Sequence, residues 1–74
     1  MTAAKFIGLM FRADPGESIA EVTRDAVQVY HDRYGAPPEV CQVHPGEDVG
    51  DVGVVVEYSQ FILPAHVLVG RREP

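Results

Sequence analysis

Three histidines and one cysteine are the side chains of this sequence best suited to bind a transition metal. Cys41 and His44 are separated by two residues, a spacing that zinc-binding pairs use. On an extended strand, however, residues three positions apart point to opposite faces. His31 falls on the polar side of a predicted helix, and the sequence has no Cys-x-x-Cys or His-x-x-x-His motif. The spacing therefore disfavours a structural zinc site.

His44 and His66 offer a different arrangement, because both lie at ends of predicted strands, with Glu57 on a third strand. If the strands pair, two imidazoles and a carboxylate would share one face of a sheet. Imidazole titrates close to physiological pH and is a common metal ligand. The sequence thus leaves open a small-ligand or metal-binding protein that uses His44, His66 and Glu57.

Catalytic motifs are weak in this chain. Cys41 lies in a valine-rich stretch, where a lone cysteine is typical of a small buried hydrophobic residue. Neither Ser18 nor Ser59 lies in a Gly-x-Ser-x-Gly motif, and Gly16 lacks the Gly-rich run and lysine of a phosphate-binding loop. We predict no catalytic residue and no cofactor. An enzyme whose site forms between two subunits stays open.

The composition is typical of a small acidic globular protein. Eleven acidic and six basic residues among 74 give a net charge of −5, which disfavours a nucleic-acid partner. The apolar run 6–11 is shorter than a signal-peptide core or a membrane-spanning helix, so we expect no membrane association and a cytoplasmic location. A single cysteine allows no internal disulfide, which fits a reducing compartment. The length predicts one domain over 1–74.

Apolar periodicity predicts the elements that position these side chains. A helix is expected over about 15–34, with Asp14 as N-cap, Glu17 completing a capping box and Gly35 ending it. Short apolar runs predict strands over about 5–11, 39–44, 52–58 and 66–70. This strand–helix–strand–strand–strand order predicts an α+β fold, a two-layer sandwich with the helix packed on one face of a four-stranded mixed sheet.

The later connections are short enough for antiparallel neighbours. Glu47, Asp48 and Asp51 could bind a hard cation through carboxylate oxygens, but their segment does not match the EF-hand pattern. A solvated hairpin loop over 45–51 is the preferred interpretation. The connection 59–65 contains an apolar run at 61–63, which either folds back over the end of the sandwich or forms an exposed contact site.

Strand alternation divides the predicted sheet into two faces. Cys41, Val43, Val67 and Val69 form an apolar set that should lie under the helix. The opposite face mixes apolar and polar residues, and one helix cannot cover it.

A half-apolar open face on a small domain favours a partner, and a second copy is the simplest one. We therefore predict a non-enzymatic protein–protein interaction or assembly module that homodimerises through the open sheet face or an edge strand. The residues expected at this interface are Phe6, Met10, Gln42, His44, Glu57, Phe61, Ile62, His66 and Leu68.

Overall fold

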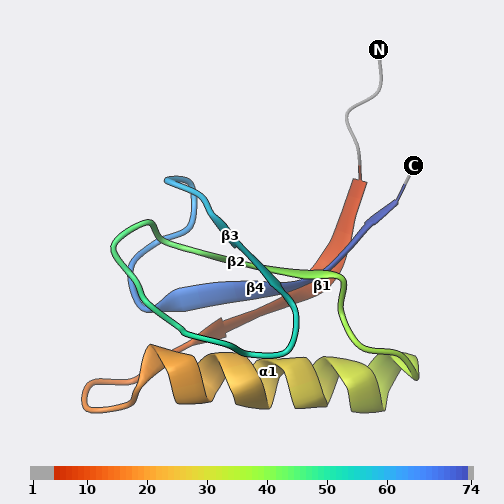
Figure 1. The fold of residues 1–74 in the computed structure, drawn as a ribbon, viewed down its shortest axis with the longest axis horizontal. Helices are drawn as coiled ribbons and strands as arrows, with labels where there is room; N and C mark the ends of the chain where they lie inside the picture. The colour runs from red at the N-terminus through yellow and green to blue at the C-terminus, as the bar shows by residue number, and fades with distance from the viewer. Residues whose placement is uncertain (1–4, 74) are drawn as a thin grey trace.

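One helix packs against a four-stranded mixed sheet, as the sequence predicts (Figure 1). The computed structural model describes the backbone of residues 5–73 and the side chains of residues 7–72. Its elements are β1 (Lys5–Arg12), α1 (Ile19–Tyr34), β2 (Val40–Val43), β3 (Val55–Tyr58) and β4 (His66–Glu73). The α+β fold class is confirmed.

The strand order in the sheet is β1-β4-β2-β3. β4 lies between β1 and β2 and is antiparallel to both, whereas β3 is parallel to β2. The expected antiparallel pairing of β2 and β3 is therefore wrong. Because parallel neighbours require a crossover, the connection 44–54 returns along the length of the strands. It packs Val49 and Val52 into the core, while α1 contacts β1 and β4. Helix and connection together cover one face of the sheet.

Two consecutive Asp-Val-Gly tripeptides shape this connection. The Oδ1 atom of Asp48 accepts a hydrogen bond from the Gly50 N–H at 3.1 Å, and Asp51 accepts one from Gly53 at 3.0 Å. Both glycines have positive φ, 64° and 84°, which side-chain-bearing residues rarely adopt. The carboxylates thus hold the backbone of a crossover, and the segment is not a hairpin loop. Extended structure resumes only at Val55, later than predicted.

The helix begins at Ile19, not near position 15, and Ser18 is its N-cap. The residues expected to start the helix form a turn instead. The Glu17 N–H donates to the Asp14 carbonyl at 2.9 Å, and Gly16 has a φ of 91°. A glycine with positive φ after a proline is typical of a type II turn. Glu17 Oε1 does accept from the Asp14 N–H at 2.7 Å, so the predicted side-chain contact closes this turn rather than the helix.

The core lies between the sheet and the layer of helix and crossover. It consists of Ala26, Tyr30, Cys41, Val43, Val49, Val52, Val67 and Val69. All members of the apolar set expected under the helix are in this core, which confirms that assignment. The helix ends as predicted at Gly35, whose φ is 75° and whose N–H donates to the His31 carbonyl at 2.8 Å.

β1 and β4 form a bent ribbon that leaves the plane of the sheet (Figure 1). Their paired ends turn away from α1, and Gly8 faces Gly70 within the ribbon. Neither glycine places a side chain on the uncovered face, so two neighbouring backbones can bend there without a steric clash. β4 also continues to Glu73, beyond its predicted end at position 70. This extension carries Arg72 over the uncovered face.

Candidate functional site

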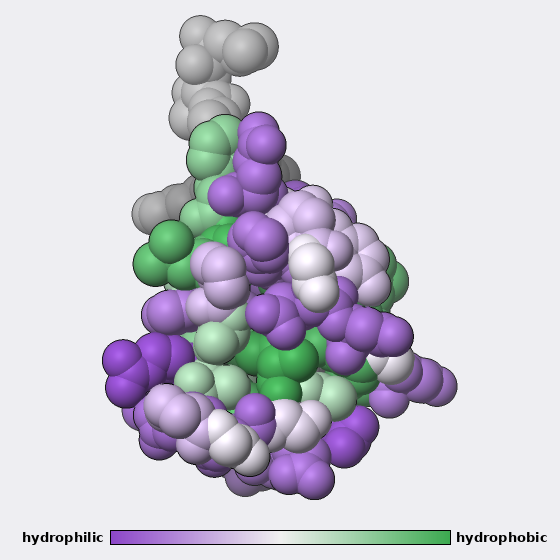
Figure 2. Space-filling view, turned by 90° about the vertical axis from the view of Figure 1, so that its left-hand side faces the viewer, coloured by the Kyte–Doolittle hydropathy of each residue, from purple (hydrophilic) through white to green (hydrophobic). Residues whose placement is uncertain are grey.

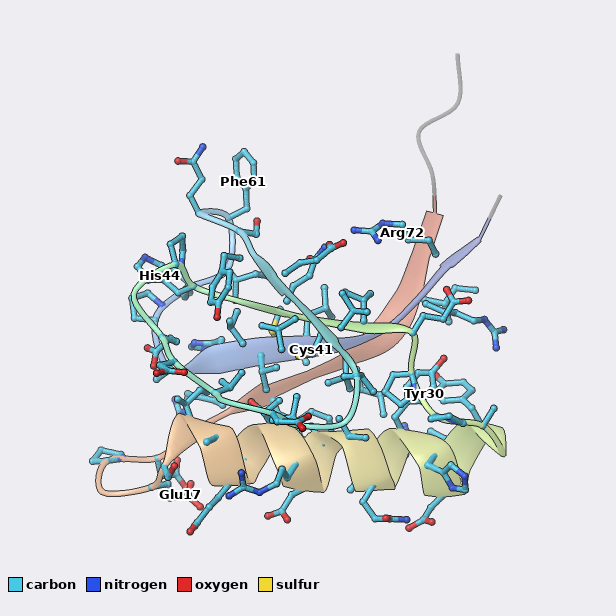
Figure 3. The ribbon with its side chains drawn as sticks, in the orientation of Figure 1. Glu17, Tyr30, Cys41, His44, Phe61 and Arg72 are labelled. Atoms are coloured by element: carbon cyan, nitrogen blue, oxygen red, sulfur yellow. The ribbon has the colours of Figure 1, made fainter. Side chains whose placement is uncertain are left out.

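A polar cluster joins three strands on the uncovered face. Glu57 Oε1 on β3 accepts hydrogen bonds from the Arg72 guanidinium on β4 and from Gln42 Nε2 on β2, the latter at 3.2 Å. These bonds, the one from Arg72 first, lower the pKa of the Glu57 carboxyl. Figure 3 shows Arg72 on the upturned ribbon, with its side chain directed back over the sheet. The charge of Glu57 is therefore neutralised within its own chain.

The centre of the uncovered face is less apolar than expected. Strand register places Val40 between the levels of Arg72 and Glu57, and only 2% of Val40 is exposed. Leu68, opposite Gln42 in the register, is half-buried. The middle of this face thus presents the ion pair and an amide, and offers little apolar area to a partner.

His44 and His66 lie at the same end of neighbouring strands. Extending the antiparallel register of β2 and β4 by one step places them opposite each other. His44 Nδ1 accepts from the Gly46 N–H at 3.1 Å, and His66 Nδ1 lies 2.9 Å from the Pro64 carbonyl. Among residues 5–73, no group of three His, Cys, Asp or Glu side chains could hold a metal ion. The register therefore makes the backbone positions of the two histidines neighbours, whereas Glu57 is engaged in the polar cluster.

Exposed apolar side chains gather along β3 and the connection that follows it. Val55 is 63% exposed, Tyr58 56%, Phe61 87% and Leu63 66%. We call these four residues the β3 patch. Ile62 between them is 6% exposed, so this one side chain closes the end of the sandwich while its neighbours face outward. Figure 3 shows Phe61 projecting from the side of the molecule opposite α1.

The backbone of β3 is free along its outer side in the described sheet. The Ser59 N–H donates to the Val43 carbonyl at 2.9 Å, so Ser59 faces β2. In a parallel ladder, alternate residues point their N–H and C=O groups toward the same neighbour. Val56 and Tyr58 therefore direct their backbone groups to the free edge, where a further strand could bind.

β1 forms the opposite edge of the sheet and differs in character. It carries the basic residue Arg12 at one end, and it bends with β4. Charged residues and bends are features that keep natural edge strands from pairing. Met10 is nevertheless 53% exposed on this strand. The side chain of Phe6, also expected at an interface, lies outside the described side chains.

The residues expected at an interface differ in their exposure. Phe61 and Met10 are exposed as expected, whereas Ile62 is buried. Leu63 belongs to the run 61–63, for which an exposed contact site was one of two alternatives, whereas Val55 and Tyr58 are not among the residues expected at the interface. Only the strand order shows that β3 is an edge, and no residue type in the sequence reports that order.

A depression of about 420 Å³ lies at the loop end of the molecule. Figure 2 shows apolar side chains in a hollow surrounded by polar ones on this side. It is lined by Ala13, Asp14, Pro15, Gly16, Glu17, Ile19, Glu47 and Ala65. Glu47 Oε1 accepts from the Ala65 N–H at 3.1 Å, and the Ala65 carbonyl accepts from the Ala13 N–H at 2.8 Å. These bonds hold Ala65 at a φ of 64°, so Glu47 has a structural contact here.

Comparison with known proteins gives no relative from which a function could be transferred. No protein-family model matches the chain, and no curated protein or solved structure is similar to it. Within residues 5–73, no helix has the length and apolar character needed to cross a bilayer. The function must therefore be argued from the surface of this chain.

Proposed function

We propose that this chain is a non-enzymatic protein–protein interaction or assembly module that homodimerises through the β3 edge of its sheet. The single observation that carries the proposal is the coincidence of an unpaired edge strand with the β3 patch. An unpaired strand offers backbone donors and acceptors to another chain. By strand alternation Val55 lies on the uncovered face and Tyr58 on the covered face, so exposed apolar side chains flank the edge strand on both sides. Exposed apolar side chains gathered along one edge are typical of protein interaction sites.

The edge is a better contact than the middle of the uncovered face. There, Arg72 and Glu57 satisfy each other, and Val40 is already buried. On β3, by contrast, Val55 and Tyr58 are more than half exposed. Burial of such side chains on association supplies favourable hydrophobic free energy.

Light scattering and sedimentation from micromolar to millimolar concentration test the proposal. We expect a concentration-dependent dimer. Val55→Lys should shift dimerisation to higher concentration, because lysine on an edge strand opposes pairing. Val29→Lys is the matched control, since Val29 is 42% exposed on α1, which does not belong to the β3 edge. A monomer throughout the range, or equal effects of the two variants, would contradict the proposal.

A second candidate function is binding of a metal or small ligand by His44 and His66. Glu57, predicted from the sequence as a third group, is instead engaged with Arg72 and Gln42. The placement of the two imidazoles at one end of β2 and β4 favours it. If it is correct, zinc or nickel raises the melting temperature and His44→Ala removes the increase. Equal melting with metal and with chelator would eliminate this function.

A further inference from the structure

We infer that the dimer forms by antiparallel pairing of β3 with β3 of a second copy, centred on Val56, and that Arg72 makes this edge compatible with its own copy. The inference rests on the proposed function and specifies its partner and register. It would join the two sheets into one continuous sheet, with both helices on the same side.

The backbone of the edge is self-complementary around Val56. Val56 and Tyr58 direct their N–H and C=O groups outward, by the alternation that Ser59 sets. In an antiparallel pair, residues that face the neighbour exchange both hydrogen bonds with the residue opposite. A two-fold axis at Val56 therefore pairs this residue with its own copy, and Tyr58 with Val54 of the second copy. Aromatic and β-branched side chains form favourable cross-strand pairs.

The charge of Glu57 selects this register over its nearest alternative. An axis at Glu57 would place the two carboxylates directly opposite each other, at a position where side chains approach most closely. Like charges directly opposite destabilise a strand pair. An axis at Val56 instead places Glu57 opposite Val55 of the second copy. The two carboxylates then lie on a diagonal.

Arg72 removes the remaining repulsion. Its guanidinium donates a hydrogen bond to Glu57 Oε1 across β2. The backbone N–H of Arg72 donates to Glu39 Oε1 at 3.2 Å, which fixes the end of β4. Each copy therefore brings a neutralised carboxylate to the interface. Val55, Val56 and Tyr58, the other residues of β3, carry no charge. This absence of net charge is the feature that favours a second copy over a charged partner segment.

Side chains beyond the strand must add to this interface. β3 has only four residues, so its backbone bonds alone make a small contact. Stable interfaces bury roughly 800 Å² per partner, and one aromatic side chain contributes about 150–250 Å² when fully buried. Phe61 and Leu63 follow β3 directly and are the most exposed members of the β3 patch. The pairing should accordingly bury both.

Thiol crosslinking of two single-cysteine additions tests the register. With the axis at Val56, position 55 of one copy and position 55 of the second copy are offset by one step of two residues along the paired strands. The two copies of position 58 are offset by two such steps. Val55→Cys should crosslink with a reagent short enough to span one step only, and Tyr58→Cys should not. Both side chains are exposed, and the native Cys41 is fully buried and does not compete.

The opposite result, with Tyr58→Cys crosslinked and Val55→Cys not, would move the axis to Glu57 and overturn the register. If neither variant crosslinks in a sample that is dimeric by light scattering, another surface forms the dimer and the inference fails while homodimerisation stands. A monomeric wild type in the same measurement removes the proposed function itself. Circular dichroism of each variant checks that the fold is retained.

The contribution of Arg72 is tested separately. Arg72→Gln should raise the dimer dissociation constant several-fold at low ionic strength, with a smaller increase at high salt, because salt screens the uncovered carboxylates. Glu57→Gln in the same chain should restore dimerisation, which a loss of local structure at β4 would not allow. An unchanged dissociation constant in Arg72→Gln, or no restoration in the double variant, would overturn this part.

Discussion

Glu57 on β3 and Arg72 on β4 form an ion pair that crosses the intervening strand β2. The pair ties the edge strand to the bent end of β4, two segments that share no direct backbone pairing. Its effect on stability can be measured separately from the proposed dimerisation by working at low protein concentration.

Glu57→Gln should lower the free energy of unfolding at neutral pH and leave it unchanged in strong acid. Because Arg72 and Gln42 lower the pKa of Glu57 in the folded state, the ion pair stabilises above the ordinary carboxyl pKa of about 4.3. This stabilisation is lost as pH falls through the folded pKa. The effect should be small, since both side chains are more than one-third exposed. Urea unfolding at pH 7 and pH 2 measures it, and an equal loss at both pH values would refute the explanation.

Ser18→Ala should lower the free energy of unfolding by about 1 kcal/mol, the usual effect of losing an N-cap. The Ser18 Oγ atom accepts from the Glu21 N–H at 3.4 Å at the start of α1. Asp14→Ala is the matched comparison. It should cost less, because Asp14 only pairs with Arg12 at 3.2 Å in an exposed salt bridge. A larger loss in Asp14→Ala would show that the helix starts at the turn instead.

Gly50→Ala and Gly53→Ala should each lower the free energy of unfolding by about 1–2 kcal/mol. Both positions have positive φ, and an added Cβ would meet no atom within 4 Å, so backbone strain alone acts. Gly46→Ala is the control without positive φ. Its Cβ would lie 3.4 Å from the movable His44 ring. Thermal and urea unfolding compare the three, and equal losses would argue against strain as the cause.

Cys41 should react with a soluble thiol reagent only when the protein unfolds. The side chain is fully buried in the core, and burial raises the pKa of its thiol, which reduces the reactive thiolate. The rate of modification should therefore rise with urea in parallel with unfolding followed by circular dichroism. Rapid modification in the folded protein would place Cys41 at an accessible site.

Local patterns sufficed for the helix, the strands and the apolar set under the helix. Alternation alone correctly assigned Cys41 and Val69 to the covered face. Local patterns did not identify the residue that caps the helix. Asp14 and Ser18 are both good N-caps, and the choice between them depends on Gly16, whose positive φ makes a turn before the helix.

Strand order could not be predicted in the same way. Pairing of β2 with β3 in parallel depends on burial of Val49 and Val52 by the crossover, a tertiary contact that no short-range pattern reports. The polar cluster could not be predicted either. Arg72 lies in the part of β4 beyond position 70, where the apolar pattern of the strand ends. The β3 patch follows from strand order, and for that reason it was only partly anticipated.

The central position of β4 has a consequence for how the chain folds. The strand that pairs with both β1 and β2 is the last of the described elements to be synthesised. β1 and β2 have no common neighbour until residues 66–73 have left the ribosome, and most contacts of the sheet join distant parts of the sequence. Such topologies fold slowly, because the chain loses the entropy of closing long loops before it gains the free energy of strand pairing. The nascent chain should therefore lack the β1–β4 and β4–β2 pairings of its sheet until β4 inserts.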